Sequence, residues 1–280
     1  MASTTAAEIH RFLGHVPQMR EWGTGRLAKG LLSETYVVEN MKYEATMEVD
    51  EDELEDDQTG QISIRTQELA QAAADHPANM IADLLINGEA AGFHSYDGVP
   101  FFSDAHVSGD SGAQSNKLDF DISAKMPAEP NTPNQASVLT MQQAFSDALA
   151  QMMTFKDDRG DVMNIGASGL VVICHATQYM NWLKAVTAAL VDNTDNVIKQ
   201  FKPDVIPMGR LTDASKFYLA KTDEPVRPFV FQKRKAVQFD AMDKANDEAV
   251  FMNGKLRYGV KARYRMVYGK WMYCVRVDFI

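Results

Sequence analysis

The chain has 280 residues, of which 45% are hydrophobic and 24% are charged, and its net charge is −10. These proportions are typical of a globular protein and exclude collagen, a disordered chain and a simple coiled coil. No apolar run is long enough to cross a membrane, the first residues lack the features of a secretion signal, and the acidic balance argues against general nucleic-acid binding.

Residues 1–26 are predicted to form an N-terminal arm. Glycines and Pro17 interrupt the helical spacing of this segment, so a regular helix is not expected there. Trp22 is its largest apolar side chain and the candidate anchor of the arm.

Residues 27–49 are predicted to form an extended β-hairpin. Large side chains that include Tyr36, Tyr43 and Met47 are spaced as in strands on either side of a polar segment at 39–42, which suits a turn. An isolated two-stranded hairpin is only marginally stable in water. We therefore expect this hairpin to lie on another surface.

An acidic run at 50–57 is expected to form a short helical turn around Leu54. Thr66 then suits the N-cap of a helix over 66–87, which the Asn-Gly pair at its end would terminate. Because Pro77 removes one backbone hydrogen bond, this helix is expected either to kink or to break, with His76 capping a second segment.

The middle of the chain alternates between loops and regular elements. Residues 92–137 are rich in Gly, Ser, Asn and Pro, and we expect them to be mostly irregular. Amphipathic spacing predicts a helix at 137–153, and an apolar run predicts a buried strand at 169–174 followed by a helix through 179–190. The two cysteines, in apolar strand-like runs, are expected to be buried free thiols.

The C-terminal segment is predicted to be rich in strands. Over 256–268 one face is apolar and the other is basic, and after Gly269 the apolar alternation changes parity, which indicates a bulge or a turn. The basic face consists of Arg257, Lys261, Arg263 and Arg265. This basic face is expected to be a strand surface that is exposed to solvent or faces a partner. The alternative interpretation is that it binds nucleic acid.

One cluster of residues suggests a different function for the chain, that of a metal-dependent hydrolase, which we keep as the alternative hypothesis. Two histidines and two aspartates fall within thirteen residues, and these residue types bind metals. They are His94, Asp97, Asp104 and His106. Their spacing fixes no tetrahedral geometry, and Asp-Gly at 97–98 is a turn signal, so an ordered loop is the competing interpretation. The sequence contains no phosphate loop and no C-x-x-C motif.

Several segments, taken together and in order, resemble the Mu-like bacteriophage major head (capsid) subunit family. They are 19–22 (MREW), 43–46 (YEAT) leading into 49–57 (VDEDELEDD), 96–106 (YDGVPFFSDAH), 227–234 (RPFVFQKR), 257–263 (RYGVKAR) and 268–271 (YGKW). No single segment is specific, but the set extends over nearly the whole chain.

The resemblance implies an α+β, Hong Kong 97-type major capsid fold. Its expected parts are an N-terminal arm at 1–26, an extended hairpin (E-loop) at 27–49, a peripheral domain at 50–157 with a spine helix at 66–87, an axial domain at 158–225, and strands at 226–280 that return to the peripheral domain. Because relatives carry more residues before the arm, the resemblance leaves open whether Met1 follows processing or truncation.

The resemblance further implies a structural protein without enzymatic activity, cofactor or metal. Its subunits would form hexamers and pentamers of an icosahedral shell around the double-stranded DNA of a tailed bacteriophage. Expected partners are copies of itself, a scaffold, a portal, a maturation protease, a decoration protein and DNA bound without sequence specificity, with no membrane. Its expected location is the virion shell, and the host cytoplasm during assembly.

Candidate contacts between subunits are the large apolar residues of the arm and hairpin and the charged residues of the acidic run and the basic face. They are Trp22, Tyr36, Tyr43, Met47, Glu53, Asp56, Asp57, Arg257, Arg263 and Arg265. We expect the acidic run at 48–57 to meet the basic face at 257–265, within or between subunits. Covalent cross-linking through Lys42 and Asn40 near the hairpin tip is not expected, because no catalytic carboxylate is indicated.

Overall fold

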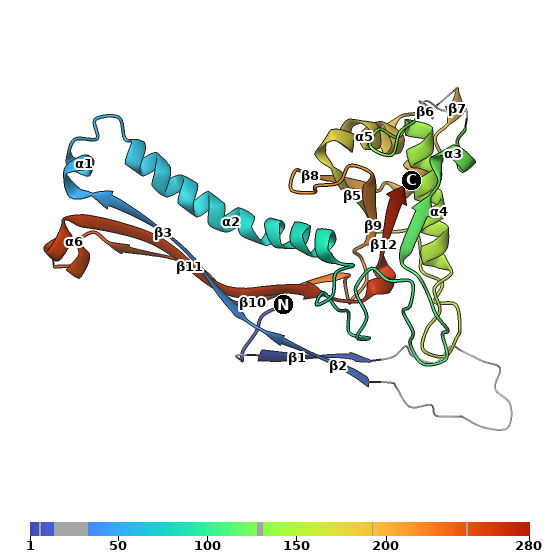
Figure 1. Ribbon diagram of the computed structural model, residues 1–280, viewed down its shortest axis with the longest axis horizontal. Coiled ribbons are helices and arrows are strands. Elements are labelled where there is room, and N and C mark those ends of the chain that lie inside the picture. The colour runs from blue at the N-terminus through green and yellow to red at the C-terminus, as the bar shows by residue number, and fades with distance from the viewer. Residues whose placement is uncertain (6, 14–32, 128–130, 192, 245) are drawn as a thin grey trace. The chain divides into compact units, whose positions relative to one another are not determined.

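A computed structural model describes residues 1–5, 7–13, 33–127, 131–191, 193–244 and 246–280 (Figure 1). The chain divides into two compact units. Unit 1 consists of Met1–Ile9, Val37–Ile81 and Phe231–Val267, and unit 2 of His10–Tyr36, Ala82–Val230 and Tyr268–Ile280. The chain therefore crosses between the units several times.

Unit 1 is built on a three-stranded sheet in the order β10 (Phe229–Met242), β11 (Lys255–Tyr268), β3 (Met41–Asp50). Strands β3 and β11 are antiparallel. The predicted alternation of β11 is confirmed, because its even-numbered residues are more buried than the basic odd-numbered ones up to Arg265. Three helices accompany the sheet: α1 (Glu51–Glu55), α6 (Glu248–Asn253) and the first part of α2 (Gln61–Asn87).

The predicted hairpin at 27–49 is wrong in its pairing. Strand β2 (Ser33–Glu39) pairs with β1 (Ala7–Leu13), whereas β3 pairs with β11. Only Asn40 separates β2 from β3.

The segment 39–42 is not a turn because the polar group of Asn40 is buried and satisfied. Its side-chain amide donates to Ser3 Oγ at 2.8 Å and accepts from Gln232 Nε2 at 2.9 Å. Apolar alternation located the strands, but it could not identify partners more than two hundred residues away in sequence. The part of the predicted arm and hairpin at 14–32 lies outside the described residues.

Helix α2 begins five residues before the predicted N-cap. Thr66 is inside the helix and its hydroxyl donates to the Ile62 carbonyl, while Asp57 accepts hydrogen bonds from the backbone N–H groups of Gln61 and Ile62. The helix continues through Pro77, so the predicted break and His76 cap are wrong. The acidic helical turn and the helix end at 87–88 are confirmed.

Unit 2 is organised around a five-stranded mixed sheet. Its order is β4 (Lys117–Phe120), β12 (Cys274–Phe279), β9 (Lys216–Lys221), β5 (Leu170–His175) and β8 (Asp204–Met208). Helix α4 (Val138–Met153) contacts β12, β9 and helix α5 (Tyr179–Thr187). Smaller elements are α3 (Ile122–Lys125), β6 (Leu190–Val191), β7 (Thr194–Asp195), and the 3₁₀ turns η1 (Ala176–Gln178), η2 (Ile198–Phe201) and η3 (Trp271–Tyr273). The helix at 137–153 and the strand at 169–174 are thus confirmed.

The predicted boundary of an axial lobe at 158–225 does not separate a compact unit in this structure. Strands β5, β8 and β9 share their sheet with β4 and β12, so the C-terminal strand does not join the sheet of unit 1. The turn expected at Gly269 is confirmed, since η3 follows it. A Cβ at Gly269 would lie 2.0 Å from the Arg227 carbonyl oxygen, so only glycine fits where β11 ends.

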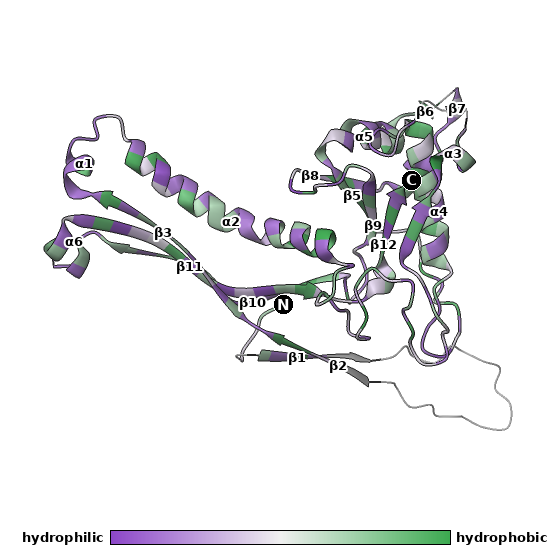
Figure 2. Ribbon diagram, in the orientation of Figure 1, coloured by the Kyte–Doolittle hydropathy of each residue, from purple (hydrophilic) through white to green (hydrophobic). Residues whose placement is uncertain are grey.

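The two units differ in how completely they bury their apolar side chains. Among the described residues, the largest fully buried side chains all belong to unit 2: Trp182, Trp271, Phe101, Phe102, Phe120, Phe145, Phe217, Lys221, Leu85, Met141, Met152 and Leu170. Both cysteines are buried free thiols, as predicted, and burial raises the pKa of Cys174 to about 12. Figure 2 shows hydrophilic and hydrophobic residues interspersed along α2.

Candidate assembly surface

An aromatic cluster holds α2 on the sheet of unit 1. The His76 ring nitrogen Nδ1 lies 2.8 Å from the Tyr264 hydroxyl. The Tyr43 ring centroid is 5.0 Å from that of Tyr264 and 4.5 Å from that of His76. Burial raises the pKa of Tyr264. The predicted contact residue Tyr43 is thus half-buried within its own chain.

Beside this cluster, α2 and the sheet enclose an apolar groove of about 260 Å³. Small side chains line it from both sides, with Ala72 and Ala73 on α2 and Ala45 on β3. Val260 and Val237 line it from β11 and β10. Alanines leave space that larger apolar side chains would fill, so this part of the helix-sheet interface is not closed. We call it the α2 groove.

The part of α2 that belongs to unit 1 contains no fully buried residue. Its apolar positions, such as Ile62 and Leu69, are half-buried, and Ile64 is 45% exposed. An amphipathic helix is stabilised mainly by burying its apolar stripe. Unit 1 covers that stripe only in part.

Helices α1 and α6 lie at the same end of unit 1. The backbone N–H of Glu51 donates to the Gly254 carbonyl, and Lys255 Nζ lies 3.0 Å from an Asp50 carboxylate oxygen. The hydrogen bond from Lys255 lowers the pKa of Asp50. Next to these contacts, Phe251 is 79% exposed and Met252 is 68% exposed. We call this pair the α6 knob.

The α6 knob was missed in the sequence reasoning, which predicted no helix within the strand-rich C-terminal segment. A signal was present: two adjacent large apolar residues stand in an otherwise polar segment that ends in Asn-Gly. Ala249 and Val250, on the same short helix, are buried. These two buried residues therefore anchor α6 on unit 1 and hold the exposed knob in position.

Charge is segregated within unit 1. The segment 48–57 contains eight acidic residues and no basic one. Arg257 meets this run as expected, with its Nε 2.8 Å from Glu48 Oε2. Arg263 does not, because the strand register places it opposite Lys42, and its buried Nε finds no hydrogen-bond acceptor among the described residues. The expected acid–base contact is therefore formed at one end of the basic face.

The other predicted contact residues occupy varied positions. Trp22 lies outside the described residues, and Arg265 and Tyr36 are half-buried. Met47, which belongs to unit 1 like Arg265, is also half-buried and lies opposite Tyr258 in the sheet.

The acidic candidates divide into two groups. Glu53 and Asp56 are exposed, at and after α1. Asp57 is occupied by capping α2, and the backbone N–H of Ile62 is the main cause that lowers its pKa to about 2. Whether any of the predicted residues contacts a second subunit stays a prediction.

The alternative interpretation of four residues as a metal site is not supported, and an ordered loop is found instead. Only Asp97 and His106 meet, with 2.6 Å between Asp97 Oδ2 and His106 Nδ1. His106 is fully buried, stacks on Trp271 at 4.2 Å between centroids, and has its other nitrogen 3.1 Å from the Phe101 carbonyl. Asp104 instead accepts from the Ser115 hydroxyl. The described residues contain no group of three or more His, Cys, Asp or Glu that could hold a metal.

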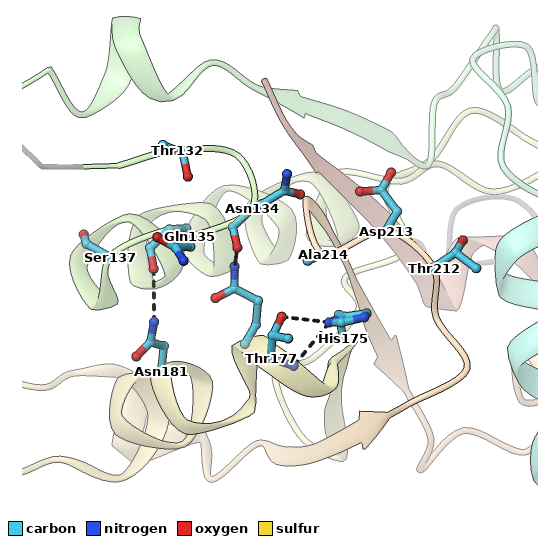
Figure 3. A pocket seen from close by; sticks show the side chains of 12 residues that line it. Thr132, Asn134, Gln135, Ser137, His175, Thr177, Asn181, Thr212, Asp213 and Ala214 are labelled. Atoms are coloured by element: carbon cyan, nitrogen blue, oxygen red, sulfur yellow. Dashed lines mark hydrogen bonds between the residues drawn. The ribbon is translucent and has the colours of Figure 1, made fainter.

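Unit 2 carries a wider, polar hollow of about 900 Å³ (Figure 3). Several side chains that line it are hydrogen-bonded within the chain. His175 Nδ1 lies 2.8 Å from the Thr177 hydroxyl, and Gln178 donates to the Asn134 carbonyl. These groups are therefore held by partners within the chain.

Within the described part of the chain, no helix combines the length and the apolar character needed to cross a membrane. The sequence is 22% identical over 275 residues to the major capsid protein of Escherichia phage Mu, covering 98% of this chain and 63% of that protein. It is 25% identical over 272 residues to the Mu-like prophage FluMu major head subunit of Haemophilus influenzae, covering 96% and 60%. The chain thus spans about three fifths of the length of these relatives.

Solved capsid structures share the fold. The capsid of cyanophage P-SCSP1u superimposes with a TM-score of 0.62 at 8% identity, covering 99% of this chain and 84% of that one. The predicted Hong Kong 97-like capsid fold is therefore confirmed. The sequence profile of the Mu-like prophage major head subunit gpT matches residues 1–126 and 207–278. This chain therefore belongs to the Mu-like prophage major head subunit family.

Proposed function

We propose that the chain is a major capsid subunit, which assembles with copies of itself into the shell of a tailed bacteriophage. Family membership supports a structural role, and one feature of the structure carries the proposal furthest. Unit 1 leaves the α2 groove, the apolar stripe of α2 and the α6 knob uncovered, while the fully buried large aromatic side chains among the described residues belong to unit 2. Exposed apolar surface of this kind is typical of protein interfaces.

The two-stranded sheet of β1 and β2 supports the same proposal. Such a sheet is marginally stable alone and presents unpaired edges. We assign to strands β1 and β2 the role that was expected of the hairpin at 27–49, namely a strand pair that lies across a neighbouring subunit. Its exposed Ile9 and Val37, at 58% each, are the apolar residues available for that contact.

Each contact needs only modest strength, because one subunit of a closed shell makes many contacts at once. Hexameric and pentameric rings around double-stranded DNA are the proposed assembly. A scaffold, a portal, a maturation protease and a decoration protein are the proposed partners, and assembly in the host cytoplasm precedes residence in the virion shell. A net charge of −10 per subunit would keep the lining from binding the packaged DNA tightly.

The test is the assembly state of the expressed chain, by size-exclusion chromatography and negative-stain electron microscopy across protein concentrations. Rings of five or six subunits, or closed shells, are the expected result. A chain that stays monomeric at every concentration and ionic strength would contradict the proposal. The major capsid protein of Escherichia phage Mu, expressed and examined in the same way, serves as the control.

A further inference from the structure

The α6 knob and the α2 groove have complementary properties and lie on the same unit. The knob exposes a phenyl ring and a thioether at 79% and 68%. The groove is an apolar space of about 260 Å³, and a cavity of about 150 Å³ is enough to accept a benzene molecule. The groove can therefore hold the ring of Phe251 with room for part of Met252.

The surroundings of the two features carry opposite charges. The knob stands beside the acidic run at 48–57, to which α6 is joined through the hydrogen bond between Glu51 and Gly254. The groove is lined by Val237 of β10, and the same strand carries the exposed Lys233, Arg234 and Lys235. Lys261 also lines the groove, but its Nζ lies 2.5 Å from an Asp240 carboxylate oxygen and Glu44 is opposite it, so the positive charge comes from the three residues of β10. Steering between opposite charges favours contact between the knob and the groove.

Charge also disfavours the alternative in which two knobs meet each other. Two copies of the acidic run would then face each other, and like charges across an interface are unfavourable. A contact between two different surfaces is heterologous, and a repeated heterologous contact closes into a ring when the rotation between copies permits.

We propose that the α6 knob of one copy inserts into the α2 groove of a second copy. This inference rests on the proposed function, because it names a contact through which the subunits associate. Phe251 is the anchor, Met252 fills the remaining space, and the acidic run lies over the basic residues of β10. Burial of a large aromatic side chain at the centre of a patch is the usual form of an interface hot spot.

The first experiment removes the knob. The variant Phe251→Ser/Met252→Ser keeps its fold because both side chains are exposed, and we expect it to associate about tenfold more weakly or worse by sedimentation equilibrium. The matched control is Met180→Ser/Val197→Ser in unit 2, with exposed fractions of 59% and 60%, which associates like wild type. Equal losses in both variants, or no loss in either, would overturn the inference.

The second experiment fills the groove instead. Ala73→Leu adds a helix-forming side chain that occupies the groove in its own chain, so the subunit stays folded but cannot accept the knob. Association is expected to weaken to a similar extent, while the denaturant midpoint of the free subunit is unchanged or higher. An unchanged association constant would contradict the proposed docking.

Cross-linking identifies the contact directly. Met252→Cys on one tagged chain and Ala72→Cys on a differently tagged chain are mixed and treated with a short bis-maleimide; the native thiols are buried. Links between the two different chains are expected. Links only between two knobs, or none in a sample that does associate, would overturn the inference and leave the proposed function standing. Absence of association by the wild-type chain would overturn both.

Discussion

Units 1 and 2 contain similar kinds of elements but bury them to different degrees. In unit 2, five strands and two helices enclose large rings; Trp182, for example, is 1% exposed and its ring centroid lies 4.4 Å from that of Phe217. In unit 1, three strands meet one helix across alanines and a single aromatic cluster. The strand β10 is exposed over most of its length.

The difference shows how one chain can combine folding with assembly. A unit with its own dense core supplies a stable folded state, since apolar burial is the main driving force of folding. A unit with half-covered apolar surface gains further stability when a partner covers that surface. The proposed capsid subunit therefore needs both kinds of unit. Units 1 and 2 should respond differently to mutation, to charge reversal, to acid and to assembly.

The largest expected difference concerns truncation of apolar side chains. Trp182→Ala in the core of unit 2 should lower the free energy of unfolding of the free subunit by about 3–5 kcal/mol. Leu69→Ala in the half-buried stripe of α2 should lower it by about 1 kcal/mol. Urea denaturation of both variants makes the comparison. Similar losses at the two sites would mean that unit 1 is packed as completely as unit 2.

Charge reversal on the basic face should separate assembly from folding. Because Arg263 lies opposite Lys42, the variant Arg263→Glu creates a favourable cross-strand pair and should leave the free subunit folded. If the basic face contacts an acidic run on a neighbour, assembly should be impaired several-fold at low salt and less so at high salt, where charges are screened. Normal assembly at all ionic strengths would show that Arg263 makes no such contact.

A smaller effect is expected from the cap of α2, and it depends on pH. The folded pKa of Asp57, about 2, is below the ordinary 3.8, so its carboxylate stabilises the fold fully above about pH 4. That contribution is lost as the pH falls toward 2. Asp57→Asn should therefore be less stable than wild type at pH 6, and the gap should narrow between pH 4 and pH 2. Circular dichroism of the helical signal measures both, with Glu53→Gln as the control for loss of one charge.

The smallest effect should come from the ion pair of Arg257 and Glu48. Both side chains are more than 40% exposed, and exposed pairs contribute about 0.2–1 kcal/mol. A double-mutant cycle with Arg257→Ala and Glu48→Ala on the free subunit would measure the coupling. A coupling energy well above 1 kcal/mol would indicate that the exposed surface of unit 1 is more ordered than the account supposes.

The sequence predicted local elements better than their partners. Helix α4 and strand β5 follow from amphipathic spacing and from an apolar run, because these signals are local. The pairing of β3 with β11 and the placement of β12 beside β9 depend on segments far apart in sequence, which no local pattern encodes. The start of α2 was misplaced because Thr66 and Asp57 are both good caps, and the choice depends on backbone geometry.

Only part of the candidate site could be predicted, because only part of it depends on local sequence signals. The basic face of β11 and the acidic run could be found from alternation and charge. The α2 groove could not, because it arises where alanines from three elements meet. The segments that resemble the head subunit family gave the fold class, but they did not indicate which apolar side chains would be left uncovered.

The most direct test of the central claim is hydrogen–deuterium exchange on the free subunit and on the assembled particle. In the free subunit, amides of α2 and β10 within unit 1 should exchange much faster than those of β5 and β9 in unit 2. On assembly, exchange in unit 1 should slow by about tenfold or more, while unit 2 changes little. Equal protection of both units in the free chain, with no change on assembly, would contradict the account.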